Sequence, residues 1–338
     1  MNLRRHLAAG AVAAALLAFA TSFARTGVQL EKFEVTAHRI DRFETGSDQT
    51  RFGPFEFVGG LELSASNPNF GGLSALRFLD GGSHFLGVED IGFWYAGTVE
   101  RDPRGSPTGV SDFRLAPILD ENGDPLRDKA WADAESLVVV GNRVDVGFER
   151  HHRIWQFPLD ADQLDMMPEP RPVPLLIPNK ELRYNQSLET LTVAPAMSPL
   201  GASRVVVSEK SLNNAGDIFA AVLEGPRKGI FFVRRTDGYD VSDGDFLPDG
   251  DLLLLERQYS LLGGIRMRIR RIAADAIRPG ATVDGPTLIE ADSSDQIDNM
   301  EGLDIWTDAA GQTHMSLVSD DNQSFFQRTV YLEFRLVQ

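Results

Sequence analysis

Asn299-Met300-Glu301-Gly302-Leu303 contains the last of five copies of one short pattern: an apolar residue, an acidic residue or serine, a small residue, then alternating apolar residues. The other copies are Leu73-Ser74-Ala75-Leu76, Ala134-Glu135-Ser136-Leu137, Leu188-Glu189-Thr190-Leu191 and Ser242-Asp243-Gly244-Asp245-Phe246. Their key positions lie roughly 54 to 61 residues apart, slightly above the usual period of a β-propeller blade. Each blade is a small sheet that buries its faces only against its neighbours. The repeat therefore predicts an all-β fold, a β-propeller of five blades.

Turn residues join the first two strand-like runs of the copies. Gly141-Asn142 lies between two Val-rich runs of the second copy, and Pro248-Asp249-Gly250 lies between two apolar runs of the fourth. These sequences favour hairpins because Gly, Asn and Asp tolerate positive φ. Third and fourth strand-like runs follow in the first four copies, which completes a four-stranded blade.

The fifth copy ends after its third strand-like run. Residues 55–63 precede the first copy as the fourth runs precede theirs, so we predict that this N-terminal strand completes the last blade and closes the ring. One more run, Phe33–Ala37, either decorates an edge or belongs to a sixth blade.

The N-terminus has the features of a signal peptide. Arg4-Arg5-His6 is basic, Leu7–Ala20 is apolar but too short to span a membrane, and Ser22-Phe23-Ala24 suits cleavage. We expect export by the Sec or twin-arginine route to a bacterial periplasm or the medium, without membrane insertion after cleavage. The predicted organisation is a signal peptide over residues 1–24, an extension over 25–54 and one propeller domain over 55–338.

Composition narrows the function classes. The chain has no cysteine, which excludes disulfides, thiol catalysis and Cys-ligated zinc. Its formal charge is −16, or −18 once Arg4 and Arg5 leave with the signal. Such a surface repels nucleic acid and anionic lipid. An anionic substrate would need local cations at its binding site to offset this negative charge. We expect the protein to be a monomer.

Counting across each hairpin places a second acidic position opposite the repeated one, to within about one residue. Asp243 is expected opposite Glu256, Glu135 opposite Phe148 or Glu149, and Glu189 opposite Glu209. The same count sets Glu301 against Ser319 or Asp320 and Ser74 against Val88 or Glu89. First strands line the channel of a propeller, so these side chains should converge at one mouth of it.

Carboxylates that converge cannot all stay ionised unless a cation lies among them. Carboxylate and carbonyl oxygens suit a hard cation, and calcium is the predicted cofactor. The candidate metal ligands are Glu135, Glu189, Glu209, Asp243, Glu301 and Asp320. Glu149, His151 and Glu256 are the candidate catalytic residues, and Arg150, Lys210 and Arg257 are the candidates for binding a small anionic or ester substrate.

Ala134-Glu135-Ser136-Leu137, Asn185-x-Ser187-Leu188-Glu189-Thr190-Leu191, Gly244-Asp245-Phe246, Leu255-Glu256-Arg257 and Asn299-Met300-Glu301-Gly302-Leu303 together resemble the phytase-like family, also described as "esterase-like activity of phytase". The resemblance covers roughly Gly59 to Leu336. It implies an exported bacterial propeller with hydrolase activity on phosphoesters or other esters.

Three functions remain open. The first is a metal-assisted hydrolase of phosphate or other esters. The second is a non-catalytic propeller that binds a ligand or protein, with carboxylates that only accept backbone N–H bonds or form local salt bridges. The third is a lactonase-like propeller that uses calcium with one acidic or histidine base.

Overall fold

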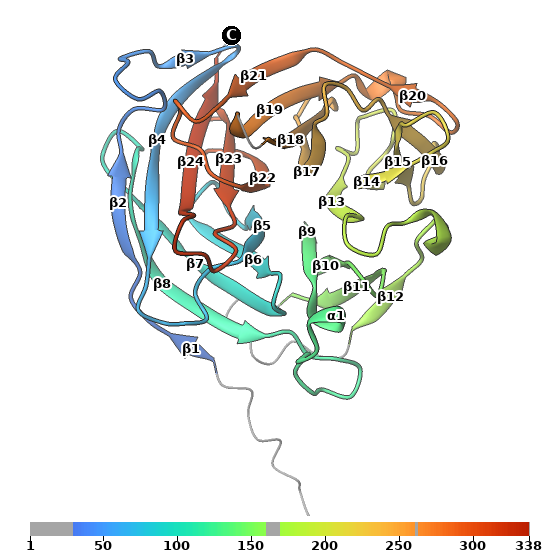
Figure 1. Cartoon of the computed structure of the whole chain (residues 1–338), viewed down its shortest axis with the longest axis horizontal. Helices are drawn as coiled ribbons and strands as arrows, with labels where there is room; N and C mark the ends of the chain where they lie inside the picture. The colour runs from blue at the N-terminus through green and yellow to red at the C-terminus, as the bar shows by residue number, and fades with distance from the viewer. Residues whose placement is uncertain (1–29, 160–169, 261–262, 338) are drawn as a thin grey trace, which may run out of the picture.

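The computed structural model describes residues 30–159, 170–260 and 263–337. The predicted signal peptide over residues 1–24 lies outside the described residues. Within them, five sheets surround a central axis (Figure 1), so the chain is a five-bladed β-propeller as the repeat predicts. In the described part of the chain, no helix is long and apolar enough to cross a membrane.

The innermost strand of each blade is the one that carries the repeated pattern, and these five strands contact one another around the axis. From the centre outwards, the first blade contains β5 (Leu73–Phe78), β6 (His84–Glu89), β7 (Phe93–Arg101) and β8 (Pro107–Pro117). The second contains β9 (Ala134–Val140), β10 (Arg143–Phe148), β11 (Arg153–Pro158) and β12 (Arg171–Val173). The third contains β13 (Leu188–Val193), β14 (Arg204–Leu212), β15 (Ile218–Val222), β16 (Gly229–Val233) and β20 (Thr282–Val283).

The last two blades continue the same order. The fourth contains β17 (Asp240–Phe246), β18 (Leu252–Ser260), β19 (Gly264–Ile272) and β21 (Thr287–Ala291). The fifth contains β22 (Met300–Thr307), β23 (Thr313–Ser319), β24 (Thr329–Leu336) and β4 (Phe55–Ser64), which also pairs with β3 (Arg51–Phe52). Short helical turns lie in connections: α1 (Lys129–Ala132), Asn179–Glu181 and Ala274–Ala276.

The ring closes as the sequence predicts, because β4 pairs antiparallel with β24 of the C-terminal segment. Residues 30–54, the part before β4 that the structure describes, form edge strands and no sixth blade. β1 (Glu31–Lys32) pairs with β8 of the first blade, and β2 (Thr36–Ile40) pairs with β4 of the fifth. The described part of the extension thus adds an edge strand to the first blade and another to the fifth.

Hydrophobic cores fill the spaces between neighbouring blades. Strand β18 has both faces buried, so it reads as a continuous Leu run rather than an alternating one. Leu253 and Leu255 pack with residues of the fifth blade, and Leu252 and Leu254 pack with residues of the third. Since a blade in a ring is covered on both faces, this packing explains why the chain needs no disulfide.

Candidate metal centre

A β-bulge interrupts the first hairpin of every blade at the repeated position. The register shift leaves one residue of each innermost strand without a partner, and these residues are Ser74, Glu135, Glu189, Ser242 and Glu301. A bulge inserts an extra residue and redirects its side chain. In each blade the bulge lies at the same end of the innermost strand, so the five side chains form one ring.

The bulges correct the register predicted for the acidic pairs. In the fourth blade Glu256 pairs with Val241, and Asp243 pairs with Leu255, so Ser242 occupies the repeated position. The prediction that Asp243 faces Glu256 is therefore wrong, because the bulge shifts the pairing by one residue. The repeated position carries a carboxylate in three blades rather than four.

The other hairpins show the same displacement. Ala134 pairs with Phe148, Leu188 with Ser208, Met300 with Ser319 and Leu73 with Glu89, and each bulged residue follows the first-named one. Glu189 consequently does not face Glu209 across the hairpin. Glu189 occupies the bulge, and Glu209 lies beyond Ser208 at the same end of the hairpin.

On each second strand, one residue follows the partner of the residue that precedes the bulge, and these residues form a second ring: Asp90, Glu149, Glu209, Arg257 and Asp320. In the second blade the Glu149 amide donates to the Asp133 carbonyl over 2.9 Å, and in the fifth the Asp320 amide donates to the Asn299 carbonyl over 3.0 Å. The equivalent bonds of the first and third blades run from Asp90 to Gly72 and from Glu209 to Ser187. Repeated backbone bonds thus set the second ring at one height.

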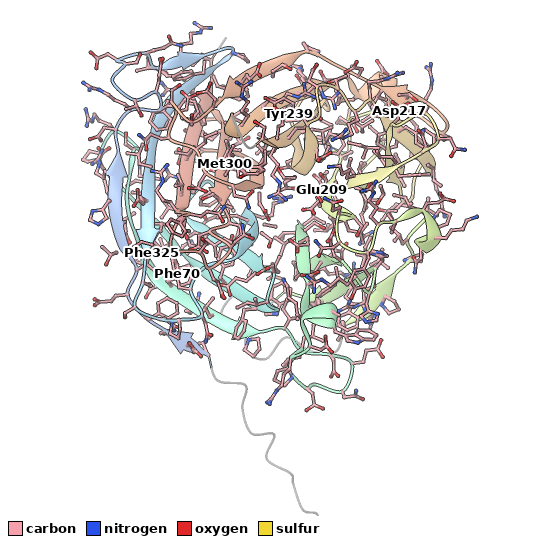
Figure 2. All side chains as sticks on the ribbon, in the orientation of Figure 1. Phe70, Glu209, Asp217, Tyr239, Met300 and Phe325 are labelled. Carbon is pink, nitrogen blue, oxygen red and sulfur yellow. The ribbon has the colours of Figure 1, made fainter. Side chains whose placement is uncertain are left out.

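The two rings and their neighbours form a set that we call the mouth cluster: Asp90, Asp133, Glu135, Glu149, Glu189, Glu209, Glu301 and Asp320, with Lys129, Arg150 and Arg257. Figure 2 shows Glu209 on the inner side of the ring, beside the axis. Eight carboxylates and three cations leave a net charge of −5 if every group is ionised. Protons or a bound cation must reduce this repulsion.

The three cations neutralise only part of the mouth cluster. Arg257 contacts Glu301, Glu209 at 3.3 Å and the Asn299 side chain at 2.6 Å. Lys129 and Arg150 each lie 2.6 Å from an oxygen of Asp133. The cations therefore leave Glu135 and Glu189 without an ion pair in the described part of the chain.

Burial and like charge raise the pKa values of the mouth carboxylates. Burial, more than the neighbouring carboxylates, raises the pKa of Glu149 to about 7 and that of Asp320 to about 8. Burial also raises the pKa of Glu135 and Glu189 well above the ordinary value, with Glu301 next for Glu135 and Glu149 next for Glu189. No hydrogen bond from the described residues offsets this effect at either residue.

Asp133, Glu135 and Glu149 can hold a metal ion. Each offers one carboxylate oxygen, and these oxygens all lie within 4.8 Å of one another. Asp133 and Glu149 are buried and Glu135 is partly exposed to the channel. An all-oxygen donor set suits calcium, magnesium or manganese rather than a soft metal.

Carboxylates deeper in the channel have structural partners. Arg77 contacts both oxygens of Asp243, at 3.0 and 3.2 Å, and donates to the Leu303 carbonyl over 2.7 Å. Asp243 also accepts the Leu303 amide of the next blade over 2.8 Å. In the same way, Asp304 accepts the Phe78 amide over 2.8 Å. Asp243 is thus paired below the mouth cluster, unlike Glu135 and Glu189.

Several predicted site residues lie away from the mouth cluster. Glu256 is buried and forms salt bridges with Arg268, at 2.5 Å, and with Arg270. His151 is exposed and stacks on Trp131 at 4.0 Å between ring centroids. Lys210 pairs with Asp240 at 2.7 Å. Of the predicted residues, the structure brings together Glu135, Glu149, Arg150, Glu189, Glu209, Arg257, Glu301 and Asp320.

Sequence reasoning missed Asp90, Asp133 and Lys129. Asp133 lies two residues before the bulge, a position that the repeated pattern did not include. Asp90 lies on the second strand of its hairpin, directly after Glu89, whereas the repeated pattern covers only the innermost strands. Lys129 carries no repeat signal, because it belongs to α1 in the connection between β8 and β9, and no other described connection contains an α-helix.

Residues 68–323 match the family model described as "Phytase-like: Esterase-like activity of phytase". Among curated proteins, no sequence matches the chain. Solved structures with a similar fold include a PQQ-bound aldose sugar dehydrogenase from Streptomyces coelicolor, at 10% identity, 89% coverage of this chain, 98% of that chain and a TM-score of 0.47. A thermostable family-43 glycoside hydrolase has 11% identity, 80% and 92% coverage and a TM-score of 0.47.

Proposed function

The chain belongs to the phytase-like family, and from this premise we propose that it is an exported, metal-assisted hydrolase of phosphate or other esters. The observation that carries the proposal is the mouth cluster, in which eight carboxylates with three cations converge at one end of the channel. Such a concentration of like charge is costly unless protons or a bound cation reduce it, and a cation would bind all of these oxygens in their ionised form.

Asp133, Glu135 and Glu149 would hold the cation, for which calcium is our candidate. A bound divalent cation polarises an ester oxygen and lowers the pKa of a coordinated water. Lys129 and Arg150 orient Asp133, and its oxygens keep a second lone pair each for a metal.

The remaining groups would bind the substrate and accept a proton. Glu189 accepts no hydrogen bond from the described residues, and burial raises its pKa well above the ordinary value, so its carboxyl group is our candidate for the proton transfer. Arg257, which lies between Glu301 and Glu209 in the mouth cluster, would contact an anionic oxygen of the substrate, whereas Lys210 pairs with Asp240 outside the cluster. A phosphate group should bind only after the metal, because the metal-free mouth is strongly negative.

The predicted signal peptide supports a periplasmic or secreted location, and the negative surface argues against nucleic-acid partners. A monomer is the simplest state for this ring, which closes within one chain.

The test combines thermal melting with hydrolysis. Melting curves in calcium and in chelator should differ, and chromogenic phosphate and carboxylic esters should be hydrolysed only with the metal. Glu135→Gln should remove both responses, whereas the surface change Glu224→Gln should remove neither. A metal-independent melting curve with no hydrolysis of either ester class would contradict the proposal.

A further inference from the structure

A pocket outside the mouth cluster borders the connection between β8 and β9. Its volume is about 470 Å³, within the range of small-molecule sites, and side chains of the segment 120–131 line it together with Trp155 of β11. None of the described residues that line it belongs to the mouth cluster. Helix α1 contributes to both features, because its Lys129 pairs with Asp133 of the mouth cluster and its Trp131 borders the pocket. The pocket is therefore a neighbour of the candidate metal centre but a separate site.

Trp131 presents an exposed indole that its neighbours hold in place. The residue is 45% exposed, whereas the other three tryptophans of the chain are buried. His151 covers one face of the indole, at 4.0 Å between ring centroids and 16° between the ring planes, and does not itself line the pocket. The Trp131 carbonyl accepts a hydrogen bond from the Arg153 guanidinium. A large aromatic side chain fixed in this way loses little conformational entropy when a ligand packs on it.

The aromatic rings behind the pocket already hold a cation. The Arg153 guanidinium lies 3.9 Å from the ring centroid of Phe148 and 4.2 Å from that of Trp155. Aromatic faces attract cations, and here an arginine of the protein itself occupies them. A cationic ligand would therefore have to compete with Arg153 for these rings.

The backbone holds two carboxylates of the pocket. Asp120 Oδ1 accepts the amides of Asn122 and Asp124 over 2.8 and 2.9 Å, and Asp128 Oδ1 accepts the Ala130 amide over 2.8 Å. These bonds fix the turn after β8 and the start of α1, so they shape the wall of the pocket. In the described part of the chain they leave Oδ2 of Asp128 as an acceptor for a ligand.

Side chains of both charge signs line the pocket. Glu121, Asn122 and Arg127 are exposed and border it beside the two held carboxylates. The carboxylates together repel an anionic ligand, whereas Arg127 and the nearby Arg153 oppose a cationic one. A neutral ring with several hydroxyl groups satisfies both kinds of side chain, because each hydroxyl donates to a carboxylate and accepts from an arginine or amide N–H.

We propose that this pocket binds a neutral sugar of one or two rings, with one ring packed on the indole of Trp131 opposite His151. The C–H groups of a sugar ring carry partial positive charge and pack on the negative face of an aromatic ring. The sugar hydroxyls would donate to Glu121 and Asp128 and accept from Arg127. The site needs no metal and is independent of the proposed hydrolysis, because it shares no residue with the mouth cluster.

Calorimetric titration of the purified protein with methyl glucoside, methyl galactoside, cellobiose and maltose tests the inference. At least one of these sugars should bind with a millimolar dissociation constant and change the tryptophan fluorescence, since Trp131 is the exposed indole. Trp131→Ala should weaken this binding about tenfold. Met197→Ala should leave it unchanged, because it removes another exposed apolar side chain, in the connection between β13 and β14.

Charged probes and further variants complete the test. Choline and glucuronate should bind more weakly than the best neutral sugar, and if Trp131→Ala fails to fold, Glu121→Gln and Arg127→Gln decide, each with weaker sugar binding. Glu135→Gln should keep sugar binding, and a protein that binds sugar without a calcium response or ester hydrolysis would remove the proposed hydrolase alone. Absence of binding by all four sugars, tighter binding of choline or glucuronate, or unchanged sugar binding in Trp131→Ala would overturn the inference.

Discussion

Replacing Arg77 by methionine should destabilise the propeller without changing its response to calcium. Arg77 is buried in the channel, where it contacts both oxygens of Asp243 and the Leu303 carbonyl. Methionine retains much of the side-chain volume but leaves Asp243 as a buried carboxylate without a cation. Removing one partner of a buried ion pair costs about 3–5 kcal/mol.

The change in melting temperature follows from the size of the domain. An unfolding entropy of about 2.1 cal/mol/K per residue over roughly 310 residues gives about 0.65 kcal/mol/K. A loss of 3–5 kcal/mol therefore lowers the melting temperature by about 5–8 °C. The double variant Arg77→Met/Asp243→Asn should recover part of this loss, because Asn still accepts the Leu303 amide and carries no charge.

The assay is thermal and urea unfolding of the four proteins of this cycle, each in calcium and in chelator. Asp243→Asn alone should keep the calcium-induced stabilisation, since Asp243 is paired below the mouth cluster. A loss of less than about 1 kcal/mol in Arg77→Met would refute the structural role, because an exposed pair is worth no more than that. Abolition of the calcium response by Asp243→Asn would restore Asp243 as a ligand.

Three further predictions concern a buried carboxyl group, a cation of the mouth cluster and a hairpin turn. Burial raises the pKa of Asp304 from 3.8 to about 8, so between these two pH values the folded state binds more protons than the unfolded state. The free energy of unfolding of the wild type in chelator should therefore fall as the pH rises from 4 to 8, and it should fall more steeply than that of Asp304→Asn. Equal slopes in the two proteins would contradict this prediction. Arg257→Met should raise the affinity for calcium about tenfold, or about 1.4 kcal/mol, because the variant removes a cation that pairs with Glu301 and Glu209 and competes with calcium for the mouth cluster. Weaker calcium binding of the variant in calorimetry would count against this prediction. Gly141 has φ +62°, and a Cβ on it would meet no neighbour, so only the backbone conformation opposes a substitution there. Gly141→Ala should lower the free energy of unfolding by about 1 kcal/mol, and Gly141→Asn should lower it by less, because Asn tolerates positive φ. Equal stabilities of the two variants and the wild type in urea would argue against the hairpin geometry.

Most of the architecture was accessible from turn chemistry and repeat spacing. Gly141-Asn142 forms the predicted two-residue hairpin between β9 and β10, and residues 55–63 close the ring within β4. The alternative of a sixth blade could not be excluded from sequence, because the pairing of the short edge strands β1 and β2 depends on which exposed edges the finished ring leaves free.

The sequence located the site only to one end of the first hairpin of each blade. Hairpin counting assumes an unbroken ladder, and a bulge adds one residue without a sequence signature of its own. The hairpin count therefore places Asp243 with Glu135, although Ser242 holds the equivalent position. The counter-charges of Glu256 come from the adjacent strand β19, and no periodicity along β18 indicates whether such a carboxylate is neutralised.

The position of a bound divalent cation tests the central claim most directly. Crystals grown with manganese, which takes the same oxygen ligands as calcium and scatters anomalously, would locate it in an anomalous difference map. We predict a peak within coordination distance of Asp133, Glu135 and Glu149, which is absent from crystals of Glu135→Gln. A map without a peak at the mouth cluster, under conditions in which manganese raises the melting temperature, would contradict the account.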